Sequence, residues 1–267
     1  MSDAKIIVEL QGAVAVVTLN DPATRNSLSA ALVRELTDFI AQADQDQTLG
    51  CIVLTATGEG FCSGGNVKDM LAGNDPMFAG TPVQMQEGYR RGIQKMTRAF
   101  HALDVPVVAA VHGSAIGAGC DLACMCDIRI AASDAKFAES FLRVGLVSGD
   151  GGAWLLPRVV GLPRALDMAL TCRTIEAAEA KEWGLVTQVL ERGAHLEAAL
   201  DVARKIAALP PVSVRLNKRL IRQSLNLTLD SCLELSAAYQ AMAQNTADQK
   251  EAVAALLEKR PPHFVGA

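Results

Sequence analysis

The pattern of apolar positions along the chain alternates between strand-like runs and helix-like segments. Residues 6–10 and 14–19 are rich in β-branched residues and flank a Gln-Gly pair, so they predict a β-hairpin. Ser29 is a suitable helix N-cap and is followed by apolar residues at helical spacing. Strands that alternate with helices in this way predict an α/β fold with parallel strand pairing. Further short apolar runs predict buried strands at residues 51–55, 107–111 and 128–131.

Residues 73–88 interrupt this alternation. They contain three glycines and two prolines and show little periodicity of apolar positions. Connecting segments of this kind run over the surface of a protein and often carry functional residues. We therefore expect a mobile loop over or beside a site in this part of the chain.

From residue 196 onward the pattern is helical only, with helices expected over residues 196–209 and 212–225, and over residues 233–257 with breaks allowed within that stretch. We therefore expect an α/β core over residues 1–195 and a helical region over residues 196–267. The apolar positions of this region exceed what one helix face covering a core requires, which predicts assembly into a trimer or a hexamer. These positions include Leu216, Leu220, Leu225, Leu227, Leu229, Leu233 and Leu235.

Composition and charge exclude several classes of protein. Half of the 267 residues are hydrophobic and the net charge is −4, without the basic clusters of nucleic-acid-binding proteins. No run of about 18 apolar residues predicts a membrane-spanning helix, and the start of the chain lacks the pattern of a secretory signal. The seven cysteines are odd in number and scattered, which is typical of reduced thiols. We therefore expect a cytoplasmic protein that binds neither nucleic acid nor membrane.

Cys120, Cys124 and Cys126 form the densest group of possible metal ligands in the sequence. They contain no Cys-x-x-Cys pair, and His112 is the only histidine close to them in the sequence. We interpret the three cysteines as small buried side chains that pack a helix and the strand after it. The sequence therefore predicts no metal site.

Two of the predicted strands each end in a glycine-rich turn, at residues 58–65 and 113–119. Backbone N–H groups left free at such turns, and at the start of a following helix, can stabilise negative charge. A dinucleotide site is disfavoured because the second turn has the spacing GxxxGxG and not GxGxxG. A serine hydrolase is disfavoured because neither Ser63 nor Ser114 lies in a GxSxG motif. An oxyanion hole built from both turns and plain structural turns are both compatible with the spacing.

The residues around both turns resemble the signatures of the enoyl-CoA hydratase/isomerase (crotonase) family. The first turn lies in residues 60–68 (GFCSGGNVK) and the second in residues 106–123 (PVVAAVHGSAIGAGCDLA). Each piece is weak by itself, but together the pieces follow the order of the family over nearly the whole chain. The other family-like pieces are residues 20–28 (NDPATRNSL), 126–129 (CDIR), 137–138 (FA), 145–147 (GLV), 151–152 (GG), 156–158 (LPR), 177–186 (AAEAKEWGLV), 258–260 (EKR) and Phe264.

The resemblance implies a crotonase-like spiral of ββα units, followed by helices that build a trimer, often paired into a hexamer. It implies an acyl-CoA thioester substrate, in which CoA enters with the substrate and no separate cofactor is used. The backbone N–H groups of Gly65 and Ala118 would form the oxyanion hole, each worth about 3 kcal/mol of barrier. The adenine end of CoA would lie near Arg25 and Asn26. Lys259 of a neighbouring subunit would contact a phosphate, with a solvated basic last turn as the alternative. The other implied substrate contacts are Ser63, Gly65, Asn66, Val67, Lys68 and Gly117.

Acid–base chemistry on such a substrate needs carboxylates within reach of the reacting carbons. Hydratases of the family use two glutamates, whereas this chain has Asp121 at the first position and Phe141, which cannot transfer a proton, at the second. Related dienoyl-CoA isomerases carry aspartate at the first position. Asp150 lies one residue after Gly149, where isomerases and dehalogenases of the family carry an aspartate. Asp121 and Asp150 are the predicted catalytic residues, with helix capping as the structural alternative.

Glu139 is a third candidate, because in a strand it would share a face with Phe141, two residues later. Its structural alternative is an ordinary ion pair or a solvated side chain. We expect Asp121 and Asp150 to line one pocket beside the Gly65 and Ala118 amides. The apolar side chain of Phe141 is expected to raise the pKa of any carboxyl group that faces it.

Three functions follow from this interpretation. The leading one is hydration of a 2-enoyl-CoA, and its alternative is double-bond isomerisation of an enoyl- or dienoyl-CoA through Asp121 and Asp150. The third, of another class, is a non-catalytic acyl-CoA-binding member of the family. The intact glycine turns favour retained thioester binding in each case.

Overall fold

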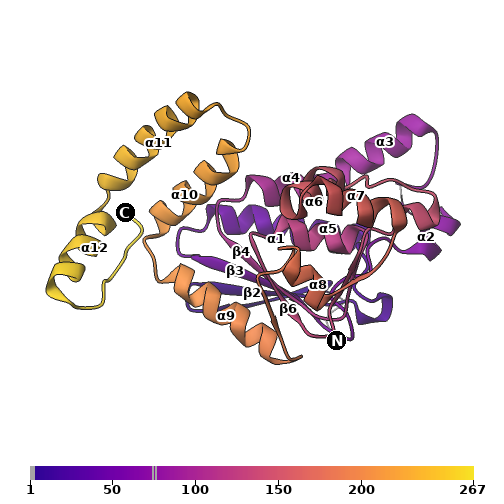
Figure 1. Cartoon of the computed structure of the whole chain (residues 1–267), viewed down its shortest axis with the longest axis horizontal. Helices are drawn as coiled ribbons and strands as arrows, with labels where there is room; N and C mark the ends of the chain where they lie inside the picture. The colour runs from indigo at the N-terminus through magenta and orange to yellow at the C-terminus, as the bar shows by residue number, and fades with distance from the viewer. Residues whose placement is uncertain (1–3, 74, 76) are drawn as a thin grey trace.

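The computed structural model describes residues 4–73, 75 and 77–267 and contains two sheets (Figure 1). In the larger sheet the first two strands form the expected antiparallel hairpin, and all the other neighbouring strands pair in parallel. Its six strands, in spatial order, are β1 (Ile6–Gln11), β2 (Val14–Leu19), β3 (Cys51–Ala56), β4 (Val107–Val111), β6 (Ile128–Ala132) and β9 (Gln188–Leu190). The smaller sheet has the order β5 (Ser114–Ile116), β7 (Lys136–Ala138) and β8 (Ile175–Glu176).

Helices surround the larger sheet and continue beyond it to the carboxyl end of the chain (Figure 1). Those that follow the first strands are η1 (Pro22–Thr24), α1 (Ala30–Gln45), α2 (Val67–Ala72), α3 (Pro82–Arg91), α4 (Ile93–Ala102), α5 (Ala118–Met125), η2 (Phe141–Val144), α6 (Gly152–Val160), α7 (Leu162–Thr171) and α8 (Ala177–Glu182). The last four are α9 (Ala194–Ala207), α10 (Pro211–Ser224), α11 (Leu229–Gln244) and α12 (Ala247–Glu258). Two of these, η1 and η2, are 3-10 helices.

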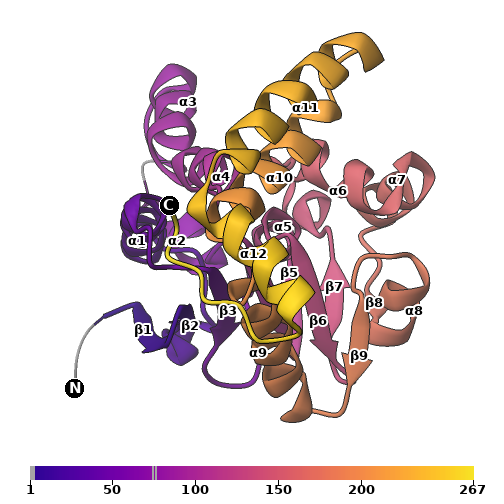
Figure 2. The ribbon, with the colours of Figure 1, turned by 90° about the vertical axis from the view of Figure 1, so that its left-hand side faces the viewer.

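Both faces of the larger sheet are buried, which explains why its central strands are continuous apolar runs. On one face, Val53 and Val108 pack with Leu200 of α9. On the other face, Leu54 and Ala109 belong to the larger core that includes residues of α1, α4 and α5. Figures 1 and 2 show α9 on the opposite side of the sheet from α4 and α5. The predicted α/β fold with parallel pairing is thus confirmed.

The expectation of a loop over residues 73–88 is wrong from residue 82 onward, where α3 begins. The Thr81 hydroxyl accepts from the Gln84 N–H at 3.4 Å, and the Gln84 side-chain oxygen accepts from the Thr81 N–H at 2.8 Å. This reciprocal capping box, with Pro82 in the first turn, starts a helix that apolar periodicity alone does not reveal. Asn74 and Pro76, which also belong to the expected loop, lie outside the described residues.

The helices α10, α11 and α12 reach away from the sheet (Figure 1). Ion pairs fix α10 to the core: Lys218 Nζ and Arg222 Nη2 each lie 2.7 Å from the Asp127 carboxylate. By contrast, α11 buries no residue in the single chain, and its Leu229 and Leu233 side chains are exposed. Among the described residues, none of the helices combines the length and the apolar character needed to cross a membrane.

Candidate active site

The two glycine turns meet because a short parallel bridge joins them. The Cys62 N–H donates to the Ser114 carbonyl oxygen, and the Ile116 N–H donates to the Cys62 carbonyl oxygen, both at 3.0 Å. A Cβ atom on Gly119 would lie 2.2 Å from that Cys62 oxygen, and a Cβ atom on Gly64 would lie 2.4 Å from the Ile116 oxygen. Glycine alone permits these approaches. The glycines therefore set the distance between the first turn and the start of α5.

This approach places the backbones of Gly65 and Ala118 in the wall of one cavity of about 420 Å³. Within the described ranges, neither N–H group donates a hydrogen bond to another protein group. Ala118 opens α5 directly after Gly117, whose φ is 54°. A helix start carries free N–H groups and the positive end of the helix dipole. Both amides are therefore available to an oxygen atom that gains negative charge.

The walls of this cavity are mostly apolar. They include Leu28, Met70, Met77, Phe78, Tyr89, Ile93, Ile116, Phe141, Val144 and Leu146. Of the substrate contacts inferred from the sequence, Ser63, Asn66, Val67 and Gly117 line the cavity, whereas Arg25, Lys68 and Lys259 do not.

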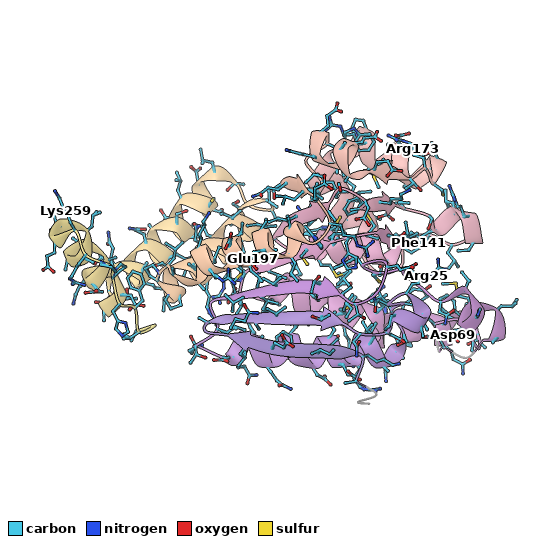
Figure 3. The ribbon with its side chains drawn as sticks, turned by 90° about the horizontal axis from the view of Figure 1, so that it is seen from below. Arg25, Asp69, Phe141, Arg173, Glu197 and Lys259 are labelled. Atoms are coloured by element: carbon cyan, nitrogen blue, oxygen red, sulfur yellow. The ribbon has the colours of Figure 1, made fainter. Side chains whose placement is uncertain are left out.

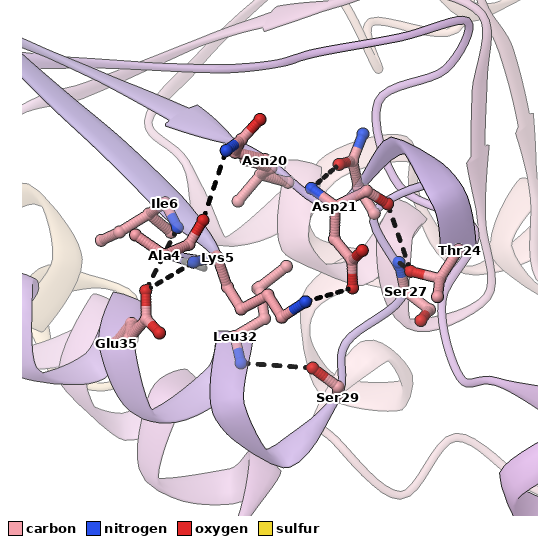
Figure 4. A network of polar contacts seen from close by, with 12 residues as sticks. Ala4, Lys5, Ile6, Asn20, Asp21, Thr24, Ser27, Ser29, Leu32 and Glu35 are labelled. Atoms are coloured by element: carbon pink, nitrogen blue, oxygen red, sulfur yellow. Dashed lines mark hydrogen bonds and ion pairs between the residues drawn. The ribbon is translucent and has the colours of Figure 1, made fainter. Parts of the chain in front are cut away.

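Arg25 lies on the turn that supports the first wall of the cavity. The Ser63 N–H donates to the Arg25 carbonyl oxygen at 3.0 Å. The buried Asn26 amide donates to two backbone carbonyl oxygens at 2.9 and 3.0 Å, and its oxygen accepts from the Asp21 N–H at 2.8 Å. Figure 4 shows the polar contacts around this turn, including the Lys5–Asp21 ion pair of 3.3 Å. Asn26 thus holds the turn, and the exposed Arg25 side chain extends from it.

Lys259 follows α12 and is exposed. Figure 3 shows it at the opposite end of the molecule from Arg25 and Phe141. A single chain therefore does not bring Lys259 to the cavity, and a contact with a bound ligand there requires a second copy of the chain.

Three carboxyl side chains meet beside the cavity: Asp121 from α5, Glu139 from the end of β7 and Asp150 from the loop before α6. Their exposed fractions are 0%, 4% and 2%, respectively. The Ser148 hydroxyl lies 3.3 Å from Asp121 Oδ2 and 3.2 Å from Asp150 Oδ1, and it accepts from the Ala153 N–H at 3.3 Å. Asp150 lines the cavity, whereas Asp121 lies behind it, away from the cavity surface.

Burial raises the pKa of all three carboxyl groups. It is the largest cause for Asp121, whose pKa lies well above its usual range, and the charges of Asp150 and Glu139 raise it further. Burial also raises the pKa of Glu139 to about 7. It raises the pKa of Asp150 as well, against the lowering effect of hydrogen bonds from Asp121 and Ser148. The group therefore retains protons near neutral pH and can both accept and donate them.

The expectation that Glu139 and Phe141 share one face of a strand is wrong. The strand β7 ends at Ala138, and Phe141 begins the 3-10 helix η2. Glu139 directly follows the strand, and its carboxyl group lies within hydrogen-bonding reach of Asp121. The Phe141 ring instead lies 3.8 Å from the position that a Cβ atom on Gly117 would occupy. Phe141 is therefore an apolar wall of the cavity.

The other chemical candidates lie away from the cavity. His112 is buried, and its Nε2 lies 3.2 Å from the Gly58 carbonyl oxygen. Trp154 packs against the Arg158 guanidinium, which lies 3.9 Å from its ring centre. The cysteines carry free thiols, and residues 4–73, 75 and 77–267 contain no group of His, Cys, Asp and Glu arranged to hold a metal ion.

Sequence reasoning missed Ser148 and Tyr89. Ser148 stands two residues before Asp150 in the same glycine-rich loop, so its hydroxyl was a visible signal. Tyr89 comes directly after the segment interpreted as a loop, and α3 brings its ring against the Gly149 backbone. A Cβ atom on Gly149 would lie 2.5 Å from that ring. A side chain at position 149 would thus collide with the ring unless the ring moved.

Comparison with known proteins agrees with this geometry. The chain is 37% identical to 1,2-epoxyphenylacetyl-CoA isomerase of Escherichia coli (strain K12) over 261 residues, which is 98% of each protein. It is 35% identical to the short-chain-enoyl-CoA hydratase of Clostridium acetobutylicum, over 96% of this chain and 95% of that protein.

Solved structures also show similarity to enoyl-CoA hydratases. The crystal structure of enoyl-CoA hydratase from Bacillus anthracis matches with a TM-score of 0.91 at 32% identity, covering 98% of this chain and 100% of that one. A family model described as enoyl-CoA hydratase/isomerase matches residues 9–267. Family, fold and geometry agree over almost the whole length, and the chain is therefore an enzyme of the enoyl-CoA hydratase/isomerase (crotonase) family.

Proposed function

We propose that this enzyme isomerises an enoyl-CoA, moving a double bond by taking a proton from one carbon and returning it to another. One observation carries the proposal: among the three buried carboxyl groups, Asp150 is the one that lines the cavity, and it shares that cavity with two free backbone amides. A base beside an oxyanion hole is the arrangement that forms a thioester enolate.

The two amides and Asp150 would divide this reaction between them. The Gly65 and Ala118 N–H groups would hold the thioester oxygen at about 3 Å. The Asp150 carboxylate would take a proton from C2 of a 3-enoyl-CoA, and the electron pair of that C–H bond would pass into the enolate. Returning the proton to C4 re-forms the carbonyl group and leaves the double bond between C2 and C3. Fixed amide dipoles stabilise the enolate oxygen without reorganising.

Phe141 favours isomerisation over hydration. Hydration requires one group to activate water and another to deliver a proton to the α carbon. Phe141 occupies the second acid–base position of the hydratases that the chain resembles, and in this structure it is an apolar wall of the cavity. A proton shift needs only one carboxyl group that accepts and returns a proton, and Asp150 fulfils this need.

Hydration of a 2-enoyl-CoA is the second candidate. The paired carboxyl groups of Asp121 and Asp150, bridged by the Ser148 hydroxyl, favour it. One group of such a pair can stay protonated while the other is ionised, which supplies both an acid and a base. The relative from Clostridium acetobutylicum, named as a hydratase, also favours this activity.

The proposed substrate contacts extend from the cavity toward Arg25. Ser63, Asn66, Val67 and Gly117 would contact the thioester arm. Arg25 and Lys68 would lie along the CoA moiety, with Lys259 supplied by a second copy of the chain. The exposed leucines of α11 support assembly into a trimer or hexamer. The free thiols support a reducing, cytoplasmic location.

A paired assay tests the proposal. Turnover of a 3-enoyl-CoA and of a 2-enoyl-CoA of equal chain length is measured with the same enzyme preparation. The proposal expects the isomerisation rate to exceed the hydration rate, and the reverse order would assign the hydratase function instead. Acyl-CoA binding without either reaction would make the chain a binding protein. Gly65→Pro removes one amide donor, and full turnover in a folded variant would contradict the oxyanion hole.

A further inference from the structure

A second cavity, of about 290 Å³, lies on the other side of the carboxyl cluster. Glu139 and Ser148 line it, together with apolar residues of α6 and α7. Two of its lining residues, Val147 and Leu170, are well exposed, so the cavity opens to the surface. Its volume is ample for water. Phe141 lines both cavities and forms part of the wall between them.

The three carboxyl groups span that wall in a row. Asp150 lines the reaction cavity and Glu139 lines the second cavity. Asp121 is fully buried between them, within hydrogen-bonding reach of both. One oxygen of each carboxyl group is buried and, among the described residues, has no donor as a partner: Asp121 Oδ1, Glu139 Oε1 and Asp150 Oδ2. Adjacent carboxyl groups satisfy such oxygens by sharing protons.

We infer that Glu139 ends a proton relay that connects the reaction cavity, through Asp121 and Asp150, with water in the second cavity. The inference rests on the proposed proton chemistry at Asp150. Glu139 acts through Asp121 and does not touch the substrate, so it is a positioning residue of the relay. The relay would let the abstracted proton reach solvent while a bound acyl-CoA fills the reaction cavity.

Each relay step moves one proton and breaks and forms one O–H bond. The Asp150 carboxylate takes a proton from the substrate carbon, leaving the electron pair in the enolate. Protonated Asp121 passes its proton to the Glu139 carboxylate, and protonated Asp150 passes the substrate proton to Asp121. Glu139 then releases a proton to water in the second cavity. A proton from water then returns along the same row to the substrate carbon and re-forms the C–H bond from the electron pair of the enolate. The net result of the two passages is exchange of the substrate proton with solvent, without any other reactant.

A purely structural role does not account for this row. Buried carboxyl groups are costly unless they are paired with cations or well hydrogen-bonded. Among the described side chains, no lysine or arginine pairs with Asp121, Glu139 or Asp150. Packing against α6 would also be served by an apolar side chain at position 139, because, apart from Ser148, the second cavity is lined by apolar residues and glycine.

The test follows isotope exchange with a saturated acyl-CoA, which can neither isomerise nor be hydrated. The substrate carries deuterium at C2, and loss of deuterium to water is measured by mass spectrometry. Glu139→Gln should slow this loss by about tenfold or more, because an amide does not relay a proton between carboxyl groups. Glu139→Asp should restore most of it. Acyl-CoA affinity should stay unchanged in both variants, and Glu9→Gln, at an exposed strand position, is the matched control.

A second variant keeps the inference falsifiable if Glu139→Gln does not fold. Ala169→Phe would fill the second cavity from α7 without altering a carboxyl group, and it should slow deuterium loss as well. Loss at the wild-type rate in either folded variant would overturn the relay. So would slow exchange that Glu139→Asp fails to restore. Because the readout requires only enolate formation, a relay failure stays distinct from a failure of the isomerase proposal, which the paired assay decides.

Discussion

The two sides of the reaction cavity are built in different ways. On one side, Gly65 and Ala118 present backbone amides whose positions are set by close contacts between two glycine turns. On the other side, Asp150 lines the cavity in front of Asp121 and Glu139, and the protons of these three side chains depend on burial and on one another. The amide side is therefore sensitive to added atoms and insensitive to pH. The carboxyl side is sensitive to charge and to pH.

Gly119→Ala should produce the largest loss of stability, because it adds an atom at the contact that positions the amide side. The new Cβ atom would lie 2.2 Å from the Cys62 carbonyl oxygen, which is backbone and cannot yield locally. We expect a loss of roughly 3 kcal/mol in the free energy of unfolding, together with loss of turnover. Urea unfolding measures the stability.

Gly145→Ala is the matched control for that change. No heavy atom lies within 4 Å of the position of its new Cβ atom, so only the left-handed backbone, with φ of 70°, opposes it. Its expected cost is about 1 kcal/mol. Equal stability losses in the two variants would show that contact between the turns does not set the positions of the Gly65 and Ala118 amides.

The pH dependence of the free energy of unfolding should reveal the raised pKa of Glu139 on the carboxyl side. The pKa of Glu139 is raised from 4.5 to about 7 by burial, so the folded chain holds a proton that the unfolded chain releases. Its contribution to stability is fully present below the unfolded pKa and is lost as the pH rises through the folded pKa. Between these limits we expect the free energy of unfolding to fall by roughly 3 kcal/mol on account of this group.

Glu139→Gln removes this titration and supplies the comparison. Urea unfolding of both proteins at pH values across that window isolates the Glu139 contribution from those of the other titrating groups. The wild type should lose more stability than the variant as the pH rises. Parallel curves for the two proteins would show that Glu139 does not titrate with a raised pKa.

Lys259→Ala should produce the smallest effect, because the residue is exposed and lies far from the cavity in its own chain. If a second copy brings it to the CoA phosphates, the acyl-CoA affinity should fall roughly two- to fivefold, with kcat unchanged, since exposed charge pairs are weak. Titration calorimetry at low and high salt measures this change. If the affinity at low salt is the same in the variant and the wild type, Lys259 does not contact the CoA phosphates and belongs to a solvated last turn.

The sequence predicted the amide side of the cavity better than it predicted the carboxyl side. Glycine spacing and strand ends located the two turns of the amide side but were equally compatible with plain structural turns. The resemblance to the family then assigned the Gly65 and Ala118 amides. The carboxyl side depends on contacts between β7, α5 and the loop before α6, which no periodicity encodes. Glu139 was selected for a strand face that does not exist, and Ser148 was missed. The helix α3 was missed for a related reason, since its start is marked by the capping pair of Thr81 and Gln84.

The most direct test of the account is Asp150→Asn, measured for both turnover and acyl-CoA affinity. The amide keeps the shape of the side chain but cannot take a proton from carbon, so turnover should fall by roughly a hundredfold or more. The cavity, the Gly65 and Ala118 amides and the CoA contacts would remain, so affinity should stay within about twofold of the wild type. Near-normal turnover in a folded Asp150→Asn variant would contradict the assignment of the proton chemistry to this residue.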